Sequence, residues 1–200
     1  MSTKSSVKLG YPNQASMYPL SAEQIDQLMT QAWECALNWT TKDGWPVGVM
    51  HVFVWHEGRV WLNFMSHRHR AAAIRRDPRV SLIVSSSSAS AGSPQGQATM
   101  KGRAVFHDDE ETKHWHFRML AEKSSPGNKP AQDALVESLD SPLRTVLEII
   151  PEKWITFDLD KLRRDQAGTL DASERGDLLS SDTERFQAEI KRRGFSVGPD

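Results

Sequence analysis

Several features that mark common protein classes are scarce or absent in this 200-residue chain. Cys35 is the single cysteine and no CxxC pair occurs, so an internal disulfide is excluded and a reducing cytoplasm is expected. The first residues lack the apolar core of a signal peptide, and no apolar run approaches the length of a membrane span. A net charge of −1 argues against a general nucleic-acid binder, whose surface would be broadly basic. We therefore expect a cytoplasmic protein without membrane or nucleic-acid partners.

Familiar catalytic and nucleotide-binding motifs are also missing. No GxGxxG turn or P-loop occurs, so neither a Rossmann site nor a nucleotide kinase is supported. No GxSxG elbow accompanies the serine run at residues 85–88, which argues against a serine hydrolase. Two HxH pairs, His67–His69 and His114–His116, are expected on helices or a loop, where alternate side chains point apart. No metal site is predicted.

One stretch near the middle of the chain organises the rest. Two short apolar runs, Val60–Met65 and Val80–Val84, have the β-branched and aromatic composition of buried strands. Between them, residues 66–77 predict a short helix that Pro78 stops. Ser66 is expected to cap this helix, leaving its first backbone N–H groups free to face an anion.

The same short helix and its flanks are rich in arginine. A single acid, Asp77, accompanies five arginines, at positions 68, 70, 75, 76 and 79. The planar arginine fork matches phosphate oxygens two at a time, and a helix N-terminus adds donors and a favourable dipole. Two interpretations follow: a phosphate-binding site, or a solvated basic helix face that keeps the protein soluble.

The other elements are predicted from hydrophobic periodicity, capping boxes and turn residues. An amphipathic helix is expected from a capping box at Ser21 to about Leu37. Residues 85–96, which are rich in Ser, Ala, Gly and Pro, predict a mobile hairpin loop. Strands are expected over residues 47–55, 97–105 and 153–159, and further helices over residues 110–122, 131–139, 141–150 and 181–193.

Several of these segments, in this order and spacing, resemble the pyridoxamine 5′-phosphate oxidase-like split-barrel flavoproteins. The segments are Lys42–Pro46 with the strand after it, the strand end Asn63–Met65, the R-x-[KR] step Arg68–His69–Arg70, Ile74–Leu82, Gln97–Ala104 and Pro151–Asp158. The resemblance covers about residues 43–162. It implies a mainly β fold, an antiparallel, Greek-key-like FMN-binding split barrel with peripheral helices. Residues 1–20 are then an N-terminal tail, residues 21–162 the flavin-binding barrel, and residues 163–200 a C-terminal extension with a helix.

The resemblance also assigns cofactor-binding roles by position. The FMN phosphate would be held by Arg68 and Arg70. The rest of the cofactor would be lined by Ser66, Phe64 and Met65 along the ribityl chain, by backbone groups of His51, Val52 and Phe53 at the isoalloxazine edge, and by Gln97 on the flavin. The groove in this family lies between two subunits, so a homodimer is implied. The redox chemistry belongs to the flavin, and no side chain is singled out as a catalytic acid or base.

The chain also departs from the family's best-known activity. Authentic pyridoxamine-phosphate oxidases carry an arginine and a lysine where this chain has Val49 and Val54, and nothing after Trp154 matches their Arg/His-rich substrate motif. We therefore expect an FMN-dependent oxidoreductase that acts on another small molecule. The deazaflavin F420 is the main alternative cofactor, because its phosphate suits the same arginines. A flavin- or haem-binding protein without turnover is the other alternative.

Overall fold

The computed structural model describes residues 6–8 and 15–198, with side chains from residue 15 to residue 195. The chain forms two compact units, one built from residues 21–155 and the other from residues 1–20 together with 156–200. Each unit is considered by itself. Among the described residues, no helix has the length and apolarity needed to cross a membrane.

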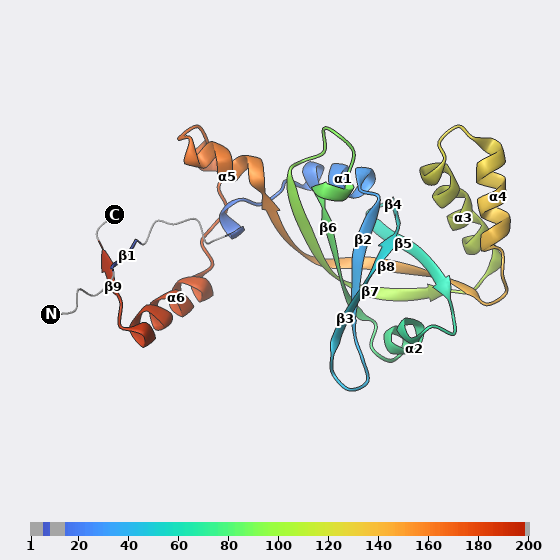
Figure 1. The fold of residues 1–200 in the computed structure, drawn as a ribbon, viewed down its shortest axis with the longest axis horizontal. Coiled ribbons are helices and arrows are strands. Elements are labelled where there is room, and N and C mark those ends of the chain that lie inside the picture. The colour runs from blue at the N-terminus through green and yellow to red at the C-terminus, as the bar shows by residue number, and fades with distance from the viewer. Residues whose placement is uncertain (1–5, 9–14, 199–200) are drawn as a thin grey trace. The chain divides into compact units, whose positions relative to one another are not determined.

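Seven strands, which lie mainly in the larger unit, form one curled sheet (Figure 1). In order across the sheet they are β3 (Pro46–Val52), β2 (Glu34–Thr40), β6 (Arg79–Ser85), β7 (Gly96–His107), β8 (Arg144–Asp158), β5 (Arg59–Met65) and β4 (Val54–His56). β3 and β4 form the two edges, yet only Phe53 separates them in sequence. The sheet therefore has to curl until its edges approach each other, which gives the predicted split barrel with antiparallel pairing.

Alternating side chains of these strands fill the barrel. In β2, Cys35, Leu37 and Trp39 are buried while the residues between them are partly exposed. Strands β5 and β6 show the same alternation. A period of two is what a strand with one face on a core requires. The strands predicted over residues 60–65 and 80–84 from their composition are confirmed as β5 and β6. The turn between β4 and β5 is the predicted hairpin, with positive φ values at Glu57 and Gly58.

Four helices lie on the outside of the larger unit: α1 (Ala22–Gln31), α2 (His69–Arg76), α3 (Glu110–Ser124) and α4 (Lys129–Leu139). Ser21 forms the predicted capping box of α1, and Asp109 caps α3 by accepting from the backbone N–H of Thr112. α3 and α4 pack as a pair, and α2 lies at the end of the barrel where β5 stops (Figure 1). The predicted loop at residues 85–96 connects β6 to β7 and contains a 3-10 turn, η2 (Ser86–Ser88). Its mobility stays a prediction.

Two helix predictions are wrong in extent or in kind. α1 ends at Gln31 rather than near Leu37, because residues 34–40 pair with both β3 and β6 as strand β2. Residues 141–150 are not a helix: a turn leads directly into β8, which also includes residues 153–158 of the strand predicted over residues 153–159. The β-branched residues Thr145, Val146 and Ile149 favour the strand, and pairing with β5 buries all three.

The smaller unit has its own short elements. β1 (Ser6–Lys8) pairs in parallel with β9 (Ser196–Gly198), and between them lie η1 (Ala15–Met17), α5 (Leu159–Gln166), η3 (Ala172–Glu174) and α6 (Ser180–Arg193). α6 confirms the helix predicted at residues 181–193, and Gly194 ends it with a left-handed backbone, φ +70°, as glycine often does at this position. Parts of the predicted N-terminal tail, residues 1–5 and 9–14, lie outside the described residues.

Candidate cofactor site at the start of helix α2

The start of α2 offers backbone donors without a side-chain cap. Arg68 occupies the N-cap position, and its side chain makes no capping hydrogen bond. The prediction that Ser66 caps this helix is wrong. The Ser66 N–H donates to the carbonyl of Leu143 at 2.7 Å, and a turn closed by the Arg68 N–H on Met65 O delays the helix by two residues. The N–H groups of the first turn are therefore not covered by a serine hydroxyl, as an anion site requires.

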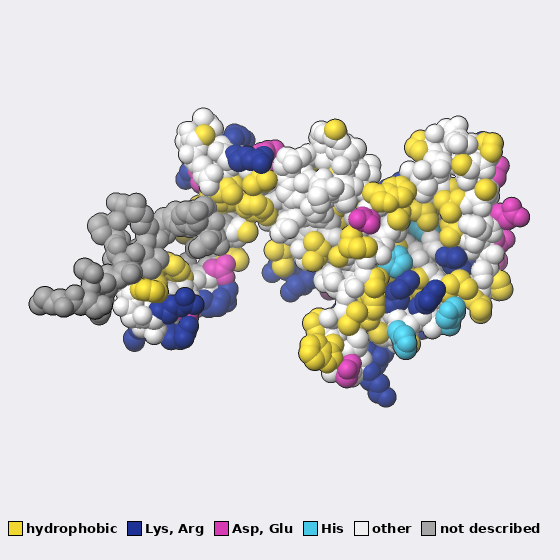
Figure 2. Space-filling view, viewed as in Figure 1, with side chains coloured by type: hydrophobic (Ala, Val, Ile, Leu, Met, Phe, Trp, Pro, Cys, Tyr) yellow, Lys and Arg dark blue, Asp and Glu magenta, His cyan; other side chains and the backbone are white. Residues whose placement is uncertain are grey.

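The five arginines of this segment fall into two groups. Three of them have partners: Arg75 lies 3.4 Å from Asp108 and over the ring of Phe106, Arg76 donates to Thr40 O, and Arg79 pairs with Asp77. Arg68 and Arg70 have no carboxylate partner among residues 15–195. Figure 2 shows Lys, Arg and His side chains gathered over this part of the larger unit. The unpaired positive charge is therefore concentrated at the first turn of α2.

Arg70 is partly buried in a way that leaves it unsatisfied. Its guanidinium carbon lies 4.9 Å from the centre of the Phe64 ring, and its Nε is buried without a hydrogen-bond partner. Burial and the neighbouring charge of Arg68 lower the pKa of Arg70. A bound anion would satisfy Nε and offset the repulsion between the two arginines. The residues present thus fit a phosphate group.

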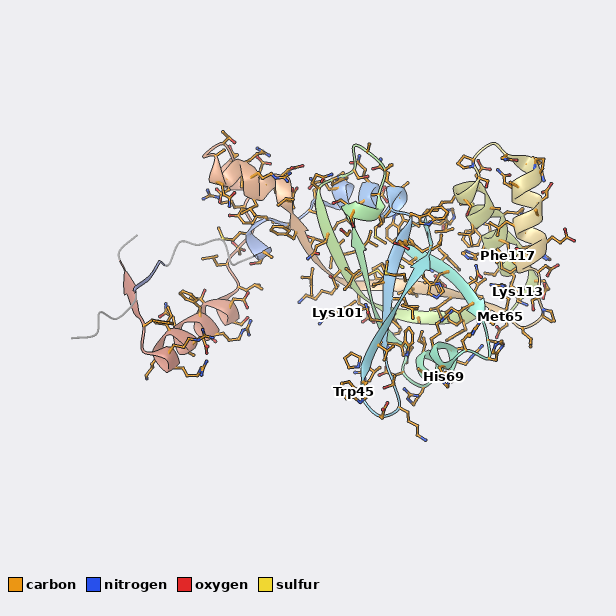
Figure 3. The ribbon with its side chains drawn as sticks, viewed as in Figure 1. Trp45, Met65, His69, Lys101, Lys113 and Phe117 are labelled. Atoms are coloured by element: carbon orange, nitrogen blue, oxygen red, sulfur yellow. The ribbon has the colours of Figure 1, made fainter. Side chains whose placement is uncertain are left out.

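Strands β3 and β5 bring two further predicted residues to Arg70. The ring of His51 lies 5.9 Å from that of Phe64. Burial, and then the charge of Arg70, lower the pKa of His51 to about 4, so the imidazole is neutral at pH 7. His51, Phe64 and Arg70 therefore form one cluster (hereafter the α2 cluster). Figure 3 labels Met65 at the end of β5 and His69 on α2 just beyond it.

Two further predicted residues follow His51 in the chain: Val52 ends β3, and Phe53 comes directly after it. Val52 pairs with Glu34 of β2. Phe53 is fully buried, and its carbonyl accepts a hydrogen bond from Lys123 Nζ at 2.7 Å, so this backbone group already has a partner within the chain. Burial lowers the pKa of Lys123 to about 8.

Gln97 lies apart from the α2 cluster. It pairs with Ser85 at one end of the β6–β7 hairpin, whereas α2 leads into Arg79, which pairs with Arg103 at the other end. Six residues of extended strand separate Gln97 from Arg103, which is about 20 Å. Ala98 and Met100 point into the barrel, so Gln97 points outward and is exposed.

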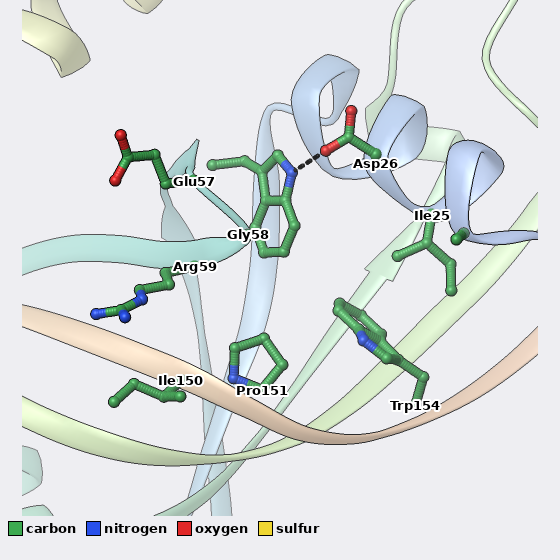
Figure 4. A pocket seen from close by; sticks show the side chains of 10 residues that line it. Ile25, Asp26, Glu57, Gly58, Arg59, Ile150, Pro151 and Trp154 are labelled. Atoms are coloured by element: carbon green, nitrogen blue, oxygen red, sulfur yellow. Dashed lines mark hydrogen bonds between the residues drawn. The ribbon is translucent and has the colours of Figure 1, made fainter.

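Two clefts on the larger unit contain none of the predicted cofactor residues. The first, of about 470 Å³, lies between α1, the β4–β5 turn and β8 (Figure 4). In it, Trp55 donates its indole N–H to Asp26 at 2.7 Å and contacts Trp154 edge-on. The second, of about 300 Å³, lies on the outer face of β2, β6 and β7 and includes Lys101. Neither cleft includes Arg68 or Arg70.

Three polar groups were missed by sequence reasoning because their members are distant in the chain. Glu148 of β8, 4 % exposed, pairs with Arg59 and accepts from His107 at 2.8 Å. Asn63, His116 and Arg144 form a second network. Glu110, His114 and Asp140 bring ligand atoms within 4.8 Å of one another, but they are on the surface, where acidic groups commonly gather without an ion. The HxH pair His114–His116 gave a partial sequence signal for the last two groups, because each histidine belongs to one of them. The two side chains point apart, as expected.

The curled sheet and its peripheral helices define a split barrel. A family model for pyridoxamine 5′-phosphate oxidase matches residues 23–158, so the chain belongs to that family and the resemblance inferred from the sequence is confirmed. No curated protein matches the chain significantly.

Solved structures share the fold at low sequence identity. A conserved hypothetical protein, Rv2991, from Mycobacterium tuberculosis is 20 % identical with a TM-score of 0.60, and the match covers 76 % of this chain and 93 % of that one. The heme storage protein HutZ from Vibrio cholerae is 14 % identical with a TM-score of 0.53, over 70 % and 97 % of the two chains. A FAD-binding protein from Mesorhizobium loti is 18 % identical with a TM-score of 0.51, over 70 % and 96 %. These likenesses establish the barrel fold.

Proposed function

We propose that this protein is an FMN-dependent oxidoreductase acting on a small molecule other than pyridoxamine phosphate. The observation that carries the proposal is the pair of unpaired arginines, Arg68 and Arg70, at the uncapped start of α2. Family membership supports a flavin at this position. When bound, the flavin supplies hydride transfer, and the protein binds and orients it.

The roles proposed for the chain's own residues follow from the α2 cluster. Arg68, Arg70 and the first N–H groups of α2 hold the phosphate, with Ser66 and Met65 next to them along the chain. Phe64 supports the Arg70 guanidinium from below, and neutral His51 adds no further positive charge beside it. The strand His51–Phe53 lines the path from the phosphate to the ring system.

The substrate proposal depends on two apolar positions. Val54 is buried at 4 % exposure, and Val49 is half-buried on β3. Neither offers the positive charge that pyridoxamine-phosphate oxidases carry there. Without these two cations the chain departs from the charge pattern of pyridoxamine-phosphate oxidases, which supports a different substrate.

F420 is the second candidate cofactor, because its phosphate would find the same arginines. Haem, which one fold relative stores, would not use a phosphate site. The visible spectrum of the purified full-length chain tests the choice. Bands near ~375 and ~450 nm are expected for FMN, whereas a single band near ~420 nm indicates F420 and a Soret band indicates haem, since each spectrum is the cofactor's own. A chain that stays colourless and takes up none of the three when mixed with them would overturn the proposal.

A homodimer is part of the proposal, because one chain leaves Gln97 far from the α2 cluster. Met50 of β3 and Ile83 of β6 both pair with Ala36 of β2, so these three residues form one row on the outer face of the sheet. Ile83 also pairs with Thr99, which lies two residues from Gln97. Met50 is 58 % exposed and Ile83 39 %, so exposed apolar side chains lie in the row next to Gln97. A second copy that covers this face would bring its own α2 cluster to Gln97.

Mixed dimers test the shared site. Light scattering at micromolar concentration should give about twice 22.6 kDa. Arg70→Ala and Gln97→Ala chains, each weak for FMN alone, are unfolded together, refolded and titrated. If the site is shared, about half of the sites in mixed dimers carry neither substitution and recover wild-type affinity. Recovery of no tight sites in verified mixed dimers would place both residues in the same chain's site.

A further inference from the structure

Besides Arg68 and Arg70, another arginine without an acidic partner among residues 15–195 lies at the same end of β5. The β5–β8 pairing sets Arg144 opposite Met65, and Arg144 Nη1 donates to Asn63 Oδ1 at 2.7 Å. Its Nε is buried without a hydrogen-bond partner, and among residues 15–195 no carboxylate pairs with its guanidinium. Burial lowers the pKa of Arg144. A partly desolvated cation without an anion is costly, so an arginine held in this state would be stabilised by a bound anion.

A chain of hydrogen bonds fixes the orientation of this guanidinium. The amide nitrogen of Asn63 lies 3.0 Å from Nε2 of His116, a fully buried side chain of α3. Arginine can only donate, so the Asn63 oxygen faces Arg144 and the amide N–H faces His116. Nε2 of His116 is then the acceptor, and the ring is neutral with its proton on Nδ1. Burial, and then the charge of Arg144, lower the pKa of His116 to about 3, in agreement with the neutral ring.

The hydrogen bond to Asn63 occupies one side of the guanidinium and leaves the other. Nη1 is used, so the edge formed by Nε and Nη2 lacks a protein acceptor among the described residues. This edge carries two parallel N–H donors and is the geometry that takes a carboxylate or a phosphate with two hydrogen bonds.

The position of Arg144 separates it from the α2 cluster. Phe64 and Met65 are neighbours on β5, so their side chains point to opposite faces of the strand. Arg70 lies over Phe64, and Arg144 lies across from Met65 next to Asn63. Arg70 and Arg144 therefore flank the same strand end on opposite faces.

We propose that Arg144 is a second anion-binding residue, which takes a carboxylate or phosphate group of the substrate, with Asn63 and His116 as its positioning residues. The assignment to a substrate rests on the proposed oxidoreductase function, but the anion site itself does not. The substrate class is then a small organic acid or a phosphate ester.

The test observes each arginine separately in the full-length chain. Arginine is labelled with ¹⁵N, and the Nε–H resonances are followed by NMR during titration with inorganic phosphate, with acetate, and with sodium chloride at matched ionic strength. Arg144→Lys and Arg70→Ala assign the two signals. We expect the Arg144 signal to move saturably with phosphate or acetate but not with chloride, and to do so also in Arg70→Ala; the anion that saturates it identifies the source.

Substitutions at two residues test whether Asn63 and His116 position the Arg144 guanidinium or only stabilise the fold. Asn63→Asp supplies the missing carboxylate inside the chain, so it should abolish the anion response of Arg144, leave that of Arg70 unchanged and keep the fold. His116→Phe removes the acceptor for Asn63 and should weaken the Arg144 response about fivefold, whereas His116→Gln, which can accept the same hydrogen bond, should restore it.

The results for the two arginines are independent. An Arg144 signal that moves no more with phosphate or acetate than with chloride, or that loses its response in Arg70→Ala, would overturn the second site. If the Arg144 signal responds and the Arg70 signal does not, the phosphate site proposed at the start of α2 is overturned and the anion site at Arg144 is supported.

Discussion

The two ends of strand β5 differ in how their charged side chains are paired. At its start, Arg59 pairs with the buried carboxylate of Glu148, which also accepts from His107. At its end, Arg70 and Arg144 lie on opposite faces of the strand, each with an unsatisfied Nε and with no acid paired to it among residues 15–195. One end contains cation and anion together, and the other contains cations alone.

The difference indicates which arginines are available for a ligand. A buried acid with two partners is satisfied by the fold and has little left to offer. Cations that are partly removed from water without an anion gain most from binding one. The same contrast holds within residues 68–79, where the paired arginines are those of the last turn of α2 and beyond.

Among tests of the contrast between the two ends of β5, the largest effect is expected from Arg70→Ala. Loss of a partly buried charged contact should weaken FMN binding by about 2–5 kcal/mol, on the order of 30- to 5,000-fold. The apo chain should melt at the wild-type temperature or above it, because the arginine has no ion pair to lose and sits beside Arg68. Fluorescence titration of FMN and thermal melts of the apo chains measure both effects.

The matched control for that variant is Arg75→Ala on the same helix. Arg75 pairs with Asp108 and lies 4.1 Å from the centre of the Phe106 ring, so its removal should affect stability more than binding. Equal FMN affinity in wild type and Arg70→Ala would mean that the start of α2 is a solvated basic surface.

At the other end of β5, Arg59→Met should act on stability alone. Methionine keeps the apolar stem of the arginine side chain but cannot form the ion pair. The Glu148 carboxylate, 4 % exposed, is then left with the hydrogen bond from His107. The free energy of unfolding should fall by about 3 kcal/mol at pH 7, with FMN affinity unchanged. Urea unfolding checks the loss, and adding Glu148→Gln to the same chain should recover part of it. A stable Arg59→Met chain would show that the paired end does not depend on its ion pair.

The pH dependence of stability tests the neutral histidine beside Arg144. Burial lowers the pKa of His116 to about 3, and an unfolded histidine titrates near 6.5. Between these values the unfolded chain binds a proton that the folded chain does not, so stability is full above about pH 6.5 and falls as the pH decreases. His116 alone should contribute a loss of about 2 kcal/mol at pH 5.

His116→Gln isolates this contribution, because glutamine cannot titrate and still offers an acceptor to Asn63. Urea unfolding at pH 7.5 and pH 5 should give a smaller difference for the variant than for wild type, by about 2 kcal/mol. His51, whose pKa is also lowered, keeps a residual slope of the same sign in both chains. An identical slope in the two chains would mean that His116 is protonated in the folded state.

Local signals predicted most of this fold, and non-local pairing decided where they failed. The capping box at Ser21 and the β-branched and aromatic composition of β5 and β6 are read from neighbouring residues, and both predictions are confirmed. Residues 34–37 and 141–150 are compatible with a helix locally. They become strands because β3, β6 and β5 offer them partners from elsewhere in the chain.

The residues of the candidate site also divide into those that a local sequence pattern predicts and those that only the fold identifies. The R-x-[KR] step is a local pattern, and it is enough to select Arg68 and Arg70 from the sequence. Which arginines lack partners could not be read from the sequence, because Asp108 and Thr40 O approach Arg75 and Arg76 only in the fold. Arg144 was missed for the same reason, since its partner Asn63 is 81 positions away.

The smallest expected effect separates the two arginines of the first turn. Arg68 is exposed, so its attraction for phosphate is screened by salt, whereas Arg70 is half-buried over Phe64. Arg68→Ala should weaken FMN binding about two- to fivefold at ~20 mM salt and hardly at all at ~500 mM, while the loss in Arg70→Ala should persist at both. Arg79→Ala, an exposed arginine that pairs with Asp77, is the control and should leave the affinity unchanged. FMN titrations at the two salt concentrations measure all three chains. If Arg68→Ala is as damaging as Arg70→Ala at high salt, both arginines contact the phosphate out of reach of solvent, and burial does not distinguish them.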